Sequence, residues 1–145
     1  MQAMNFNDAD AATVALADLK RKWVKITRQF SEWTEYWSEV AHQKLSHIVV
    51  IDPTDEVGPR FTATTLGKDF TVEMTSRIIN GELYGRVLIH TPDPLNNSRL
   101  LAGEFLMSDN GKILSPEGAE IYDRNANNTA DYILFCEIIR VAIAA

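Results

Sequence analysis

The side chains in this sequence that have the spacing of a metal site lie between positions 32 and 42. Glu39 and His42 form a Glu-x-x-His pair, the spacing by which helical bundles aim two ligands at one metal ion, and Glu32 and Glu35 precede them. Such sites take further carboxylates from neighbouring helices, and the sequence predicts only one long helix with a polar face. We therefore predict a solvated acidic surface here, with no bound metal and no cofactor.

The other reactive side chains form no catalytic pattern. Cys136 lies in an apolar helical stretch, where a thiol is more typical of inert packing than of a nucleophile. His47 and His90 stand alone, without the spacing of metal ligands. The sequence contains no Gly-x-Ser-x-Gly elbow, phosphate loop or dinucleotide fingerprint. We predict no catalytic residues and favour a non-enzymatic protein.

One long amphipathic helix must position most of these residues. Apolar residues recur at alternating intervals of three and four, which places them on one stripe of a helix: Leu16, Leu19, Trp23, Ile26, Phe30, Trp33, Trp37 and Val40. Asn7 or Asp8 can cap the start, and neither glycine nor proline interrupts positions 8–45. We predict that the stripe is core or subunit interface, with an exposed recognition face as the alternative.

The length of this helix predicts a dimer. At 1.5 Å per residue it would run roughly 55 Å, whereas a compact domain of this size is about 35 to 40 Å across. The helix must either break in its alanine-rich beginning or project and bury its stripe on a second copy of the chain. We favour packing on a sheet, with the overhang used for dimerisation.

The charges on the helix are divided along its length. Positive side chains crowd its middle and negative ones follow, so an antiparallel copy would set basic turns against acidic turns. A solvated surface is the alternative, and a nucleic-acid patch is disfavoured by the net charge of −6. The candidate interface combines these charges with two residues of the C-terminal helix: Arg21, Lys25, Arg28, Glu32, Glu35, Glu39, Phe135 and Ile139.

After Leu45 the pattern alternates between apolar and polar residues, which predicts strands. The predicted strands are 46–52, 60–66, 70–79, 82–90, 99–107 and 113–114. Asn80-Gly81 is a strong hairpin signal, which pairs Ile78 with Leu83 and places apolar residues on one face. A second turn at Gly67-Lys68 would set Phe61 and Ala63 beside Met74 and Val72.

The same register places Ser76 opposite Gly85, which leaves a shallow spot in the apolar face. A tryptophan of the long helix could fill it, or it could form an open apolar pocket for a small ligand. The candidate pocket or core residues are therefore Trp23, Phe30, Trp33, Trp37, Ser76 and Gly85.

An apolar C-terminal helix over 130–144, capped by Asn127 or Asn128, completes the predicted fold. The fold class is α+β in one domain, 1–145: a long N-terminal amphipathic helix packed on a five- to six-stranded antiparallel meander, closed by a hydrophobic C-terminal helix.

Composition restricts the class of partner. The pI near 5.0 suits a soluble acidic protein, the apolar runs are shorter than a membrane span, and the first residues lack the pattern of a secretory signal. We expect a cytoplasmic protein with no membrane partner. The predicted function is a homodimeric interaction module, such as an adaptor, inhibitor, immunity-type protein or small acidic chaperone, that binds another protein. The alternative is a small-ligand binding or catalytic cone with an apolar pocket between helix and sheet.

Overall fold

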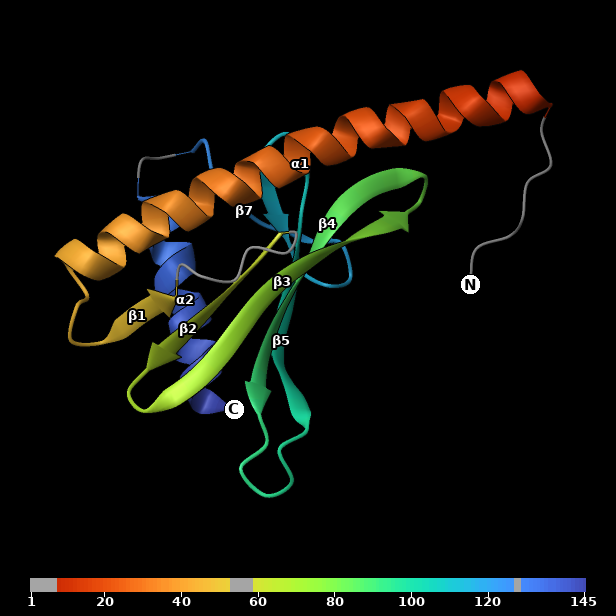
Figure 1. The fold of residues 1–145 in the computed structure, drawn as a ribbon. Helices are drawn as coiled ribbons and strands as arrows, with labels where there is room; N and C mark the ends of the chain where they lie inside the picture. Colours follow the sequence, from red (N-terminus) through yellow and green to blue (C-terminus); the bar gives the residue numbers. More distant parts are fainter. Residues whose placement is uncertain (1–7, 53–58, 127–128) are drawn as a thin grey trace.

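A 35-residue helix, α1 (Ala9–Gln43), crosses one face of a sheet and extends beyond it (Figure 1). The computed structural model describes residues 8–52, 59–126 and 129–145. Asp8 caps the helix, because the backbone N–H of Ala11 donates to Asp8 Oδ1 over 2.8 Å. The helix is continuous through its alanine-rich beginning, so it projects instead of breaking.

Seven strands form one antiparallel sheet in which each strand pairs with its neighbour in the sequence. The strands are β1 (Val49–Asp52), β2 (Arg60–Thr65), β3 (Lys68–Ile79), β4 (Glu82–Pro92), β5 (Arg99–Met107), β6 (Lys112–Leu114) and β7 (Glu120–Asp123). The predicted α+β meander is confirmed, with one strand more than the six at most that were predicted. The additional strand, β7, has four residues and pairs with β6 at the edge of the sheet.

The β3–β4 hairpin has the predicted register. Asn80 and Gly81 both have positive φ, 50° and 79°, as a two-residue turn of this hand requires. Ile78 therefore pairs with Leu83, and Ser76 pairs with Gly85.

The register predicted for β2 and β3 is wrong by two residues. The turn is centred on Leu66 and Gly67, whose φ values are 47° and 79°, so Thr65 pairs with Lys68. Phe61 consequently lies opposite Val72 rather than Met74, and Ala63 opposite Phe70 rather than Val72. Because the shift is even, the apolar side chains keep their face.

The second helix, α2 (Ala130–Ala144), packs on the same face of the sheet as α1. Gly85 of β4 lies against Ile26 of α1, and Gly103 of β5 lies against Val141 of α2. The predicted caps Asn127 and Asn128 lie outside the described residues, and Thr129 precedes the helix. Neither α1 nor α2 combines the length and hydropathy that a membrane-crossing helix needs.

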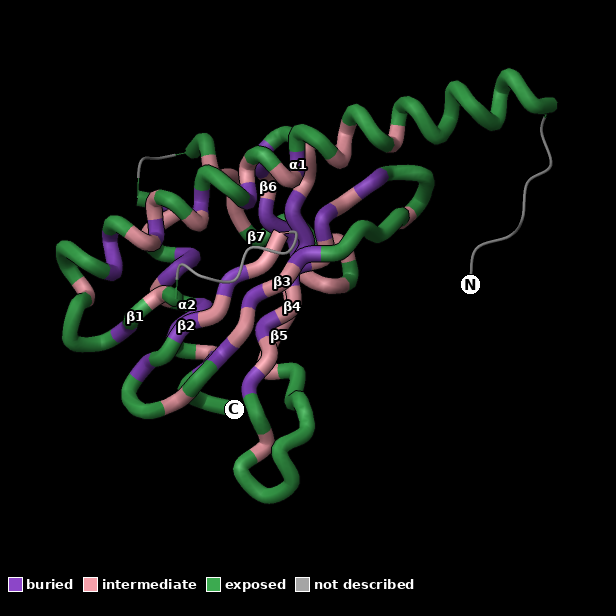
Figure 2. The backbone as a smooth tube through the Cα atoms, viewed as in Figure 1, coloured by how far each residue is buried: buried purple, intermediate pink, exposed green. Residues whose placement is uncertain are grey.

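The core lies between the helices and the sheet (Figure 2). Trp33 and Trp37 are fully buried, and their rings stack at a centroid distance of 5.1 Å. Trp37 also stacks on Phe135 of α2 at 5.2 Å, so the aromatic residues connect both helices. Truncating one buried side chain of this size to alanine lowers the free energy of unfolding by about 3 to 5 kcal/mol.

Candidate interaction surface

The first half of α1 extends past the part of the sheet that buries this helix. Residues 9–25, the projecting segment, precede Ile26, the first buried residue of α1, and span about 25 Å. Figure 2 shows this part of the helix as exposed over most of its length. Its cap and its alanine content support helix formation, but a helix this short is marginal alone in water.

The apolar stripe of α1 continues onto the projecting segment without full cover. Leu16 is 68% exposed, whereas Leu19 and Trp23 are half-buried. The spacing of three and four extends upstream to Ala12 and Ala9, so these five residues form one line, the seam. The seam is thus an apolar line that this chain covers only in part, and exposed apolar surface of this kind is typical of interaction sites.

The β3–β4 hairpin reaches toward the projecting segment (Figure 1). A groove lies between the hairpin and the seam. This hairpin groove has a volume of about 610 Å³ and is lined by Leu19, Lys20, Trp23, Ser76, Arg77, Ile78 and Leu83. Lys22 joins helix and hairpin at the edge, because its Nζ lies 3.4 Å from Glu82 Oε2. The groove is thus apolar inside, with Lys20 and Arg77 as a basic rim and the Lys22–Glu82 ion pair at its edge.

The predicted pocket residues divide between the core and this groove. Trp23 and Ser76 line the hairpin groove, whereas Phe30, Trp33 and Trp37 are core residues. Gly85 is covered, since a Cβ there would lie 2.4 Å from Met74 Sδ and 2.8 Å from Ile26 Cγ2.

Isoleucine and methionine therefore fill the Gly85 side of the shallow spot that was predicted to take a tryptophan or to form a pocket. The Ser76 side opens onto the hairpin groove, which Trp23 also lines.

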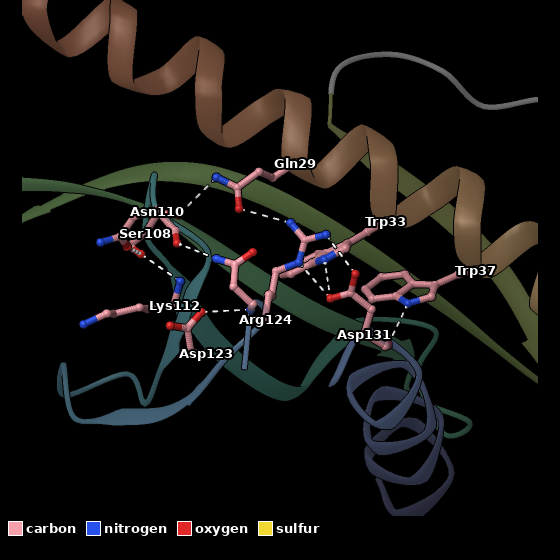
Figure 3. Close-up of polar contacts among 10 residues, drawn as sticks. Gln29, Trp33, Trp37, Ser108, Asn110, Lys112, Asp123, Arg124 and Asp131 are labelled. Carbon is pink, nitrogen blue, oxygen red and sulfur yellow. Dashed lines mark hydrogen bonds and ion pairs between the residues drawn. The ribbon is translucent and has the colours of Figure 1, made fainter. Parts of the chain in front are cut away.

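A polar network fixes the buried half of α1 to α2 (Figure 3). The indole N–H of Trp33 donates to Asp131 Oδ1 over 3.0 Å, and that of Trp37 donates to the Asp131 carbonyl, also over 3.0 Å. Arg124 donates to both carboxylate oxygens of Asp131, over 2.7 and 2.8 Å, and to Gln29 Oε1 over 3.1 Å.

This network is structural. The Arg124 guanidinium also lies 4.7 Å from the Trp33 ring centroid, so its charge is paired and stacked. Sequence reasoning missed Gln29, Arg124 and Asp131. The sequence does indicate that buried tryptophans need hydrogen-bond acceptors for their indole N–H groups. It does not indicate which residue accepts, because the acceptor is distant in the sequence and is brought close only by the fold.

The predicted interface residues lie in two different environments. The six charged residues are all exposed on α1, and Arg21 pairs with Asp18 of its own helix. Phe135 and Ile139 are buried in the single chain, at 0% and 6% exposure, so they belong to its core.

The predicted acidic surface also lies on α1. Glu35, Glu39 and His42 are exposed there. Within the three described ranges, no group of three His, Cys, Asp or Glu side chains lies close enough to hold a metal ion.

A second cavity, of about 500 Å³, lies between α2 and strands β5 to β7. Its lining is mostly apolar and includes Gly103, Ile113 and Leu134. Tyr122 also lines it, and its hydroxyl is buried with no hydrogen-bond partner among the described residues. Burial raises the pKa of this phenol well above its usual range, so the hydroxyl keeps its proton. Small-molecule sites in proteins have volumes of about 300 to 1,000 Å³ and mostly apolar linings, and this cavity lies within both ranges.

Charged side chains pair across β3, β4 and β5. Arg99 Nη2 lies 2.6 Å from Glu73 Oε1, and His90 Nε2 lies 3.1 Å from the same oxygen. Burial raises the pKa of Glu73, but the hydrogen bond and charge of Arg99 more than offset it, and the net pKa is lowered. Burial lowers the pKa of His90, and the charge of Arg99 lowers it further against the opposing effect of Glu73. The three groups form a structural cluster in which Arg99 neutralises the Glu73 carboxylate.

Comparison with family models, with characterised proteins and with solved structures found no match to this chain.

Proposed function

We propose that this chain is a non-enzymatic protein-interaction module that acts as a homodimer through the seam of its projecting segment. The observation that carries the proposal is the partly covered apolar line, with Leu16 at 68% exposure, on a helix that extends beyond its own sheet. The dimer is the unit that binds a further protein, as an adaptor, inhibitor, immunity-type protein or small acidic chaperone does.

The energetics favour a second copy as the occupant of the seam. Fully burying a leucine side chain contributes about 1.5 to 3 kcal/mol. In a symmetric pair this applies to both copies of the exposed Leu16, and to a smaller extent to both copies of the half-buried Leu19. The same pairing would support a helical segment that is marginal alone. The acidic first turn, with Asp8 and Asp10, also complements the basic rim of the hairpin groove.

Light scattering on the purified protein at micromolar concentration tests the proposal. We expect twice the chain mass of 16.3 kDa. Replacing Leu16 and Leu19 together by Glu should give a monomer with an unchanged circular dichroism spectrum in the sheet region, since neither side chain is fully buried in the core. Val14→Glu is the matched control, because Val14 is 60% exposed on the opposite side of the helix and should leave the dimer intact. A wild-type mass of one chain at every concentration would overturn the proposal.

Small-ligand binding is the second candidate function, and the cavity beside α2 supports it. Its apolar walls and the unpartnered Tyr122 hydroxyl suit a neutral apolar molecule with one hydrogen-bonding group. Saturable binding of the neutral dye N-phenyl-1-naphthylamine tests this function. The candidate requires that binding persists in the Leu16→Glu, Leu19→Glu variant, because loss of binding there would place the dye on the seam.

A further inference from the structure

We infer that the two copies pair their projecting segments antiparallel, with the two-fold axis at the level of residue 14. Leu16 then lies against the partner's Ala12, and Leu19 against the partner's Ala9. This inference rests on the proposed homodimer and specifies its orientation and register. It follows from the size of the seam residues, the positions of the charges and the part of α1 that the sheet leaves free.

Side-chain size favours the antiparallel arrangement. The seam begins with two alanines, Ala9 and Ala12, and continues with two leucines, Leu16 and Leu19. Antiparallel pairing about residue 14 sets every leucine against an alanine, so all layers of the interface have similar volume. Parallel pairing would set leucine on leucine and alanine on alanine, which leaves the alanine layers underpacked.

The charges favour the same arrangement. Asp8 and Lys22 flank the seam on the same side, at its two ends. In the antiparallel register Asp8 lies beside the partner's Lys22, and the pair occurs twice in the dimer. A parallel dimer would instead hold both aspartates at one end of the interface and both lysines at the other, so the attractive pair would not form. Antiparallel helix dipoles add a smaller favourable contribution.

The sheet determines where along α1 the partner can lie. From Ile26 onward the stripe is covered by this chain's own strands, and the hairpin groove already flanks Leu19 and Trp23. A partner helix can therefore occupy the seam only over the projecting segment, with its first turn ending at the hairpin groove. From the charge pattern alone, the basic turns around Arg28 were predicted to face the acidic turns around Glu32 of a second copy. In the part of α1 that the sheet leaves free, Asp8 is instead the acidic residue that faces the partner's Lys22.

Disulfide trapping tests the orientation. Ala12→Cys and Leu16→Cys are prepared separately, each with Cys136→Ser, and are oxidised alone and as an equimolar mixture. In the inferred register neither introduced thiol meets its own copy. Identical positions are offset by about 6 Å along the helix axis, in addition to the lateral separation of the two helices, so their Cα atoms lie beyond the reach of a disulfide. We expect cross-linked dimer in the mixture and little in either variant alone.

Each other outcome has a distinct meaning. Cross-linking of both variants alone would show a parallel dimer and overturn the inference while leaving the homodimer in place. Dimer mass without any cross-link would place the interface elsewhere, which also overturns the inference. A monomer mass for the wild-type chain would overturn the proposed function itself.

The charge pair supplies an independent measurement. In a Glu82→Gln background, which removes the partner of Lys22 within its own chain, Lys22→Glu should weaken the dimer about tenfold in Kd, because each dimer loses two attractive pairs and gains two repulsive ones. Lys25→Glu is the matched control: Lys25 is exposed on the outer side of α1 and should leave Kd unchanged, although the sequence placed it in the interface. Equal effects of the two substitutions would show a general charge effect and contradict the register.

Discussion

Asp131 is the residue that holds the two buried indoles of α1 in place. Its carboxylate accepts from Trp33 and Arg124, and its backbone carbonyl accepts from Trp37. The Arg124 side chain is only 13% exposed, so removing its partner would leave a largely buried charge unpaired. We expect Asp131→Ala to lower the free energy of unfolding by about 3 kcal/mol, measured by urea denaturation.

Glu137→Ala is the matched control for this substitution. Glu137 is on the same helix and also pairs with an arginine, Arg140, but both side chains are more than half exposed. Glu137→Ala should lower the free energy of unfolding much less than Asp131→Ala, since exposed ion pairs are screened by water. Equal losses for the two substitutions would contradict the structural role of the network.

His90 makes the stability depend on pH near neutrality. Because its pKa is lowered in the folded protein, the unfolded chain takes up the proton first as the pH falls below about 7. Above that pH His90 is neutral in both the folded and the unfolded protein, so it does not contribute to the pH dependence of stability. We expect the free energy of unfolding to fall between about pH 7.5 and about pH 5.5, and to fall less in His90→Gln.

Urea midpoints at the two pH values measure this difference. His47→Gln is the control, because His47 is exposed. The charged groups that face His90 are Glu73 on β3 and Arg99 on β5, and the lowered pKa of Glu73 acts only in more acidic solution. A rise in stability on acidification would show that protonated His90 gains more from Glu73 than it loses to burial and Arg99.

Among the elements, the β2–β3 turn contains a local conflict between residue type and backbone. Leu66 has a φ of 47°, a left-handed conformation that costs a residue with a Cβ about 1 kcal/mol. Its side chain is 68% exposed and contributes little packing. Leu66→Asn would create the Asn-Gly pair preferred in this turn, and we expect a gain of about 0.5 to 1 kcal/mol in a thermal or urea unfolding experiment.

Leu95→Asn is the control for this turn. Leu95 is the more exposed leucine and is not among the residues with positive φ, so its replacement should leave stability unchanged. A loss of stability in Leu66→Asn would show that the Leu66 side chain packs in the folded protein.

At the scale of the whole molecule, the sequence predicted what depends on local patterns. The Asn80-Gly81 turn defined the central hairpin because the turn chemistry and the alternation agreed. The β2–β3 register was predicted wrongly because a leucine in the left-handed region has no sequence signal. The network of Gln29, Arg124 and Asp131 was not predictable, since its members are brought together only by the packing of α2 on α1.

Leu16, Leu19 and Trp23 of the seam were predicted as part of a longer stripe, but the extent of the seam along α1 was not. The spacing of the stripe marked one face of α1, but it could not show where the sheet ends along that face. Only the fold shows that full burial begins at Ile26, whereas Leu19 and Trp23 of the seam are covered in part.

The strict neighbour-to-neighbour order of the sheet has a consequence for the route of folding. Each strand pairs with the strand next to it in the chain, so every pairing closes a short loop at small entropic cost. The bond between Trp33 and Asp131, by contrast, joins residues 98 positions apart. The sheet can therefore form by successive local steps, and we expect the meeting of α1 with α2, which completes the burial of the tryptophans, to be a late event.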